Sequence, residues 1–159
     1  MKHLHRLQRR QAGVTLIITM VMLVLITLVG VAVIRSTTMD EKMAGNTRDR
    51  DKALQSAEAA VRVCLAQVIA GTVTATVLAP APSTATANWA VPSNWSVSSS
   101  SSQAVSTSAI DAATAGLAAQ PRCMFELLGA GSGNYRVTGR ALGASAQTEV
   151  ILQATYSPY

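Results

Sequence analysis

The side chains that could carry out catalysis or bind a metal are few and widely separated along the chain. Both histidines, His3 and His5, lie in the first thirteen residues. Beyond residue 70 the acids are Asp111, Glu126 and Glu149, which are too scattered to predict a carboxylate pair or a metal cage. Serines abound, but none lies in a nucleophile-elbow motif. We therefore expect no enzyme, no metal site and no cofactor.

Two further patterns could indicate binding chemistry. Alternating glycines at Gly129, Gly131 and Gly133 could form a phosphate loop, but a β-prone segment follows them instead of a helix, so a flexible hairpin turn is the better interpretation. A near-repeat places Trp89 and Trp95 six residues apart. The two indoles could cover the edge of a thin core, or they could anchor a neighbouring protein, since exposed tryptophan often carries binding energy.

Charge is concentrated at the N-terminus. The formal net charge is +5, and the bases Lys2, Arg6, Arg9 and Arg10 all precede residue 14 without an accompanying acid. Removing these four would leave +1. The remaining bases lie among acids, as in residues 48–52, so no basic stripe predicts nucleic-acid binding.

The next segment predicts a membrane-spanning helix. Residues 14–34 contain no charged side chain, and these 21 residues would form a helix of about 31 Å, enough to cross the hydrocarbon layer. Bases before this segment and the acids Asp40 and Glu41 after it favour a single pass with a cytoplasmic N-terminus.

The small residues Ala12 and Gly13 precede the apolar run, whereas a secretory signal has its cleavage site after a shorter apolar core. This order resembles the class III signal of type IV prepilins. The resemblance implies that prepilin peptidase removes residues 1–13 by cutting between Gly13 and Val14, and that the new Val14 amine is methylated. A plain signal anchor preceded by glycine is the alternative.

The stretches 39–46 (MDEKMAGN), 48–50 (RDR) and 53–62 (ALQSAEAAVR) extend this likeness. Together with the signal they resemble the N-terminal region of the PilX family of minor pilins over roughly residues 11–62, and the tail between 135 and 156 is similar in style but weaker. The resemblance implies an α+β, type IV pilin-like fold, in which a long N-terminal helix packs on a small antiparallel sheet.

The same resemblance implies a function and partners. A minor pilin resides in the inner membrane of a Gram-negative bacterium before assembly and is extracellular once it is part of the pilus. It contributes to pilus assembly and thereby to adhesion or twitching motility. Its implied partners are prepilin peptidase, the major pilin, other minor pilins and a large tip adhesin. Two alternatives stay open: a pseudopilin of type II secretion, and a signal-anchored bitopic ectodomain that acts as a sensor or binding module.

One position departs from the wider pilin pattern. Most type IV pilins carry a glutamate as the fifth mature residue, where this chain has Ile18. That carboxylate is thought to neutralise the terminal amine of the subunit ahead, because an unpaired charge in an apolar bundle is costly. A subunit with nothing ahead of it needs no such group, so Ile18 suggests a position at or next to the tip. Loss of the glutamate without positional meaning is the alternative.

Residues 35–70 are expected to continue as an amphipathic helix that ends at Gly71 and bends or unwinds at Gly30 or Gly45. The apolar positions that fit a 3.6-residue period, and should face the sheet, are Leu54, Ala57, Val61, Cys64, Leu65 and Val68.

The remainder divides by composition. Residues 71–121 are rich in Ser, Thr, Ala and Pro and are expected to form a long, largely mobile surface connection, with a short helix over 110–119. Residues 122–159 should form an antiparallel meander with strands over 123–128, 135–142 and 148–156.

The cysteines are Cys64, on the helix face that should meet the sheet, and Cys123, at the start of the first strand. Export would place both in an oxidising compartment, so we predict a disulfide between them. Two buried free thiols are the alternative.

Overall fold

The computed structural model describes residues 12–129 and 131–158, and the chain divides into two compact units, residues 1–45 and 46–159. Nearly all of the expected leader, including His3 and His5, lies outside the described residues.

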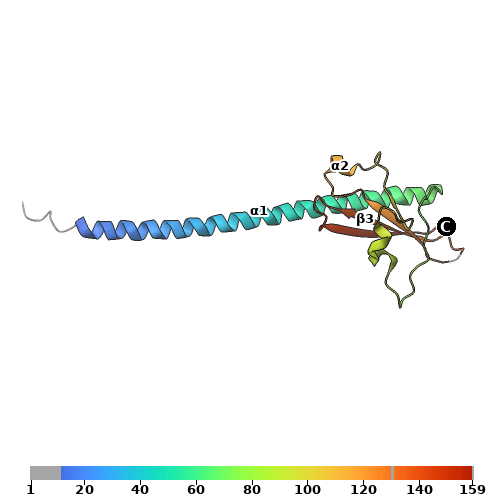
Figure 1. Ribbon diagram of the computed structural model, residues 1–159, viewed down its shortest axis with the longest axis horizontal. Coiled ribbons are helices and arrows are strands. Elements are labelled where there is room, and N and C mark those ends of the chain that lie inside the picture. The colour runs from blue at the N-terminus through green and yellow to red at the C-terminus, as the bar shows by residue number, and fades with distance from the viewer. Residues whose placement is uncertain (1–11, 130, 159) are drawn as a thin grey trace, which may run out of the picture. The chain divides into compact units, whose positions relative to one another are not determined.

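Helix α1, Ala12–Ala70, contributes to both units (Figure 1). Every residue in it is helical, including Gly30 and Gly45, so the local unwinding considered at these glycines does not occur. The helix ends at the predicted glycine cap. Gly71 adopts a left-handed φ of 68°, and the amide of Thr72 donates to the carbonyl of Gln67 at 2.9 Å.

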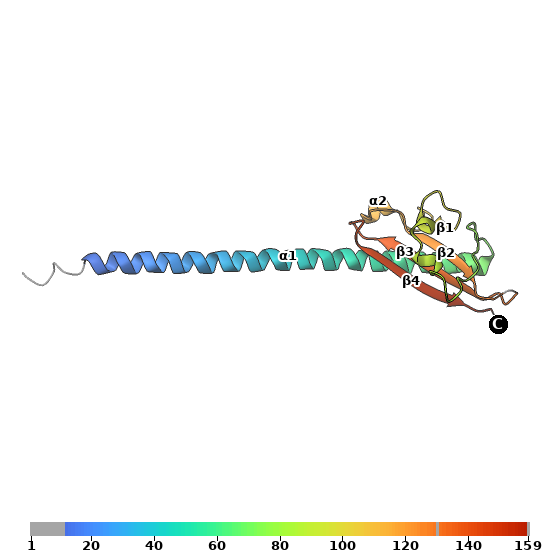
Figure 2. The same cartoon turned by 60° about the horizontal axis from the view of Figure 1, so that its bottom comes forward.

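The second unit contains a four-stranded antiparallel sheet (Figure 2), which confirms the predicted α+β class. Its strands follow one another in chain order: β1 Ser102–Ala104, β2 Arg122–Leu127, β3 Tyr135–Leu142 and β4 Glu149–Tyr156. The predicted limits of β3 are confirmed, and those of β2 and β4 are correct to within one residue. The sequence did not predict β1.

The helix face that packs on the sheet agrees in part with the predicted one. The side chains of α1 that are completely buried are Ala53, Ala57, Ala60 and Cys64. Of the predicted set, Ala57 and Cys64 are confirmed as buried, whereas Leu54 is exposed. Val61, Leu65 and Val68 are half-buried. The helix and sheet approach each other closely here. A β-carbon on Gly139 of β3 would lie 2.6 Å from Cγ2 of Val61, so glycine on the strand makes room for this helix side chain.

The connection between α1 and β2 is more structured than predicted. It contains the 3-10 helices η1, Asn88–Ala90, and η2, Pro92–Trp95, as well as β1. Trp95, Ser102 and Val105 are buried, so the segment is not merely a surface connection.

The short helix in this connection is also shorter than predicted. Helix α2 covers only Ala112–Ala115, where Asp111 caps its start and Gly116, with a φ of 65°, ends it.

Candidate assembly and partner-binding surfaces

The N-terminal part of α1 is an apolar surface that nothing in the described chain covers. Every Val, Leu, Ile and Met side chain from Val14 to Ile34 is exposed. By length and composition α1 is the described helix that could span a membrane. An apolar surface of this extent is stable only against lipid or against other protein.

The polar side chains within this apolar surface are satisfied by the helix itself. The hydroxyl of Thr19 donates to the carbonyl of Leu16 at 2.9 Å, and that of Thr27 donates to the carbonyl of Val24 at 2.8 Å. Since each hydroxyl finds its acceptor within one helical turn, neither requires water. The segment can therefore enter a lipid or protein interior without leaving these hydroxyls unpaired.

The residues predicted for processing lie together at the start of α1. Gly13 has open space around it, and Val14 and Ile18 are exposed one helical turn apart on the same side of the helix. Any protein or lipid that packs on this end of α1 meets Val14 and Ile18 together. Cleavage at Gly13 and methylation of Val14 remain predictions.

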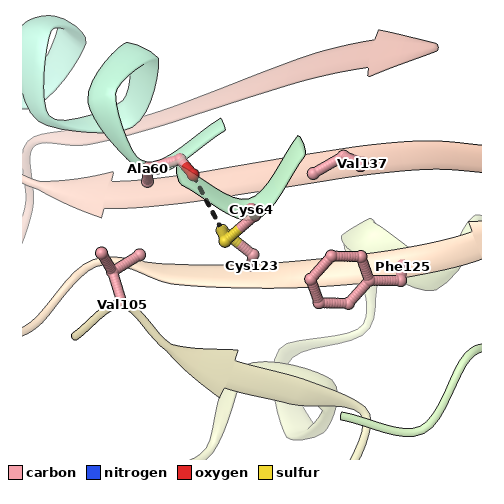
Figure 3. Close-up of a cluster of buried hydrophobic side chains, with 6 residues drawn as sticks. All are labelled: Ala60, Cys64, Val105, Cys123, Phe125 and Val137. Atoms are coloured by element: carbon pink, nitrogen blue, oxygen red, sulfur yellow. Dashed lines mark hydrogen bonds between the residues drawn. A yellow bond between two sulfur atoms is a disulfide. The ribbon is translucent and has the colours of Figure 1, made fainter. Parts of the chain in front are cut away.

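In the second unit, a disulfide joins Cys64 of α1 to Cys123 of β2. Both residues are completely buried, and Val105, Phe125 and Val137 surround them (Figure 3). The Cys123 sulfur lies 3.3 Å from the carbonyl oxygen of Ala60. The helix is therefore linked covalently to the sheet in the middle of the apolar core.

Asp49 ties α1 to the turn between β3 and β4. Its carboxylate accepts hydrogen bonds from the backbone amides of Ala144 and Ser145, the latter at 3.3 Å. The pKa of Asp49 is lowered mainly by a hydrogen bond from the Thr148 side chain. Desolvation, the second-largest cause, raises it, and the two amides and Lys52 lower it further.

The two tryptophans have different environments. Trp95 is 5% exposed, and its indole nitrogen donates to the carbonyl of Trp89 at 2.8 Å. The guanidinium of Arg140 lies over its ring, 5.7 Å from the centroid. Trp89 is 40% exposed. Trp95 therefore belongs to the core, and Trp89 is the one of the pair that is available to a partner.

A buried carboxylate holds the tryptophan segment on the sheet. Glu126 of β2 is 2% exposed, accepts a 2.7 Å hydrogen bond from the side-chain amide of Asn88, and lies 3.5 Å from Arg136. Because Asn88 immediately precedes Trp89, this contact sets the position of the exposed indole. Sequence reasoning missed the roles of Glu126, Asn88 and Asp49, since their partners lie far away in the chain.

No group of three or more His, Cys, Asp or Glu side chains that could hold a metal occurs within residues 12–129 and 131–158. The structure offers an exposed apolar helix segment and a disulfide-linked head, residues 46–158.

Two family models match the chain. One, described as PilX N-terminal, covers residues 12–62, and the other, described as type IV pilus assembly protein PilX C-term, covers residues 46–158. The chain belongs to the PilX family. It is accordingly a type IV pilus-associated minor pilin, a structural component of the pilus. No curated protein and no solved structure matches it significantly.

Membership in the PilX family gives both surfaces a context. The long apolar helix together with the family indicates a membrane-anchored pilin, and the family implies interaction with other pilus components. The family models also span the residues that only the structure brings together, because Asp49, Glu126 and Trp89 all lie within the second match.

Proposed function

We propose that this PilX-family protein is a low-abundance subunit that primes assembly of a type IV pilus and stays at or next to its tip. Residues 1–13 are removed at Gly13, and Val14 becomes a methylated N-terminus. Through assembly the subunit contributes to adhesion or twitching motility.

The observation that carries this proposal is the uncharged, exposed apolar surface from Val14 to Ile34, directly after Gly13. Before assembly this surface is covered by inner-membrane lipid, and in the fibre by the helices of other pilins. Ile18 supports a terminal position, because an isoleucine lies where a shaft subunit usually has a carboxylate for the amine ahead of it.

The partners follow from this pathway. Prepilin peptidase acts at Gly13 on the cytoplasmic side, and the head lies on the opposite side of the inner membrane. The major pilin and the other minor pilins pack against α1, and a large tip adhesin is a further partner for the head.

Two other functions would use parts of the same structure. A type II secretion pseudopilin shares the cleavage signal, but the family model that covers residues 46–158 names type IV pilus assembly. A signal-anchored ectodomain acting as a sensor would keep its N-terminus intact, and this feature separates it from the pilin function.

Processing tests the proposal directly. The N-terminal mass of the protein from membranes and from sheared surface fibres should correspond to a chain that starts at methylated Val14. Gly13→Val should leave the chain uncut in the membrane, whereas Gly45→Val, a matched change of a helical glycine with open space around it, should leave cleavage intact. A mature N-terminus at Met1, or beyond Ile34, would contradict the proposed pilin function.

A further inference from the structure

The outer edge of β4 is a long, regular and uncovered row of backbone groups. β4 is the last strand in the sheet order and lies outermost on its side (Figure 2). Its eight residues pair with β3 without a bulge, from Tyr135 with Tyr156 to Leu142 with Glu149. Within residues 12–129 and 131–158 no backbone hydrogen bond reaches the other side of β4.

The ladder shows which backbone groups point outward. The amide of Gly143 donates to the carbonyl of Thr148, so these two residues form a hydrogen-bonded pair at the turn. Because bonded pairs alternate along antiparallel strands, Val150, Leu152 and Ala154 direct their amides and carbonyls to β3. The residues whose amides and carbonyls point away from the sheet are Glu149, Ile151, Gln153 and Thr155.

This edge has none of the features that usually protect an edge strand. Between Val150 and Tyr156 there is no charged residue, proline or glycine, and the charge of Glu149 is neutralised by Arg140 at 2.5 Å. The opposite edge is different. β1 has only three residues, and the nearby backbone amides of Thr74 and Ala75 donate to the Gln103 side chain.

Two hollows with largely apolar walls lie beside the exposed edge. One of about 280 Å³ is lined by Trp89, Ile151, Leu152 and Gln153, and a second of similar volume lies between Trp89, Trp95, Ile151 and the Arg140–Glu149 pair. Glu149, Ile151 and Gln153 have their side chains on the face of the sheet where the hollows lie. An added strand would place every second side chain on this same face, where it could enter a hollow. The hollows favour apolar groups there.

We propose that β4 binds an extended, uncharged and mainly apolar segment of another type IV pilus subunit, which pairs with the outward amides and carbonyls as a fifth strand. Main-chain pairing provides the affinity, and the hollow beside Trp89 selects the side chain. The identity of the partner as a pilus subunit rests on the proposed function, whereas the extended backbone follows from the edge itself.

Residue-resolved amide exchange tests this proposal. The full-length, isotope-labelled chain in lipid nanodiscs is measured alone and together with the major pilin and each minor pilin of the same organism. Alone, the amides of Ile151, Gln153 and Thr155 should exchange freely, while those of Val150, Leu152 and Ala154 are protected. A binding subunit should slow the outward set at least tenfold and change the inward set little.

A matched pair of variants separates main chain from side chain. Gln153→Pro removes one outward amide without touching the ladder to β3, and should weaken binding of that subunit at least tenfold. Gln153→Ala keeps the amide but loses the hydrogen bond to Thr138 Oγ1 (3.1 Å) and part of the wall of the hollow, and should weaken binding much less than Gln153→Pro. If Gln153→Pro does not fold, Thr155→Pro against Thr155→Ala replaces it.

The outcomes are distinguishable. If subunits bind but the outward amides stay unchanged, or if none binds, the edge proposal is overturned while the processing result still decides the pilin function. Protection that appears in the chain alone and rises with its concentration would mean that a second copy occupies the edge, which also overturns the proposal. An uncut N-terminus together with no binding defeats both.

Discussion

Asp49 connects helix α1 to the turn between β3 and β4 through backbone amides. Its charge state should therefore affect the stability of the head. Its carboxylate accepts from Ala144 and Ser145, and Thr148 lowers its pKa most. A group whose pKa is lowered in the folded state stabilises that state above the unfolded pKa, and this contribution is lost as the pH falls through the folded pKa.

Asp49→Asn should accordingly lower the melting temperature at neutral pH and reduce the loss of stability on acidification below about pH 4. The effect should be modest because the site is open to solvent. Thermal unfolding between pH 2 and pH 7 measures it, with Asp51→Asn, an exposed neighbour on the same helix, as control. Equal acid sensitivity in Asp49→Asn and the native chain would contradict this role.

Gly139 of β3 lies where the sheet closely approaches helix α1. An alanine there would place its β-carbon 2.6 Å from Cγ2 of Val61 and 3.1 Å from the carbonyl oxygen of Ala57. Valine in a helix has little rotamer freedom, so the strain cannot be relieved by a simple rotation. We expect Gly139→Ala to destabilise the head by about 1–3 kcal/mol.

Denaturant unfolding measures this loss, and Val61 provides the test of its cause. Adding Val61→Ala removes the closest atom, so the double variant should lose less stability than the sum of the two single changes. Gly45→Ala, where nothing lies within 4 Å, should be neutral or slightly stabilising. Strict additivity of Gly139→Ala and Val61→Ala would argue against the contact.

At the scale of elements, the link between α1 and β2 carries much of the stability expected of the head. The Cys64–Cys123 bridge closes a sequence separation of 59 residues, for which the chain-entropy model gives about 4 kcal/mol. The core around the bridge is small and consists largely of alanine, valine and one phenylalanine. A covalent constraint on the unfolded chain should therefore be a large part of the net stability.

Replacing both residues, Cys64→Ala with Cys123→Ala, should cost about 2–5 kcal/mol of unfolding free energy. Alanine is preferred to serine because both sites are completely buried and alanine adds no polar group to the apolar core. Unfolding of the variant and of the native chain with and without reductant measures the cost. Two alkylatable thiols in protein isolated under non-reducing conditions would refute the bridge.

For the whole molecule, the question is where it lies in a fibre. With Ile18 in place of the usual glutamate, the subunit does not offer a carboxylate to the amine of a subunit ahead. We expect gold particles directed at an epitope inserted in the exposed turn 106–109 to mark fibre ends, with few copies per fibre. Labelling of the major pilin along the shaft is the control. Particles spaced regularly along the shaft would defeat the tip position.

Much of this molecule was predictable because the signals are local. An uncharged run of 21 residues predicts its helix whatever surrounds it, and glycine at position 71 ends that helix by its own backbone freedom. The strands β2, β3 and β4 were predicted from β-prone runs separated by glycine-rich turns. The family resemblance likewise depended on residues 11–62, where neighbouring residues in the chain carry the pattern.

What only the tertiary structure decided depends on groups far apart in the chain. β1 has three residues with no strand pattern of their own, and it becomes a strand because its backbone pairs with β2. Ala57 and Cys64 were predicted to be buried, but only the structure shows that Ala53 and Ala60 are buried too and that Leu54 is exposed. Trp89 and Trp95 occur in nearly identical local sequences, yet one is exposed and the other buried. Local periodicity fixes which side chains share a face, but only long-range packing decides which face is covered and which edge of the sheet stays free.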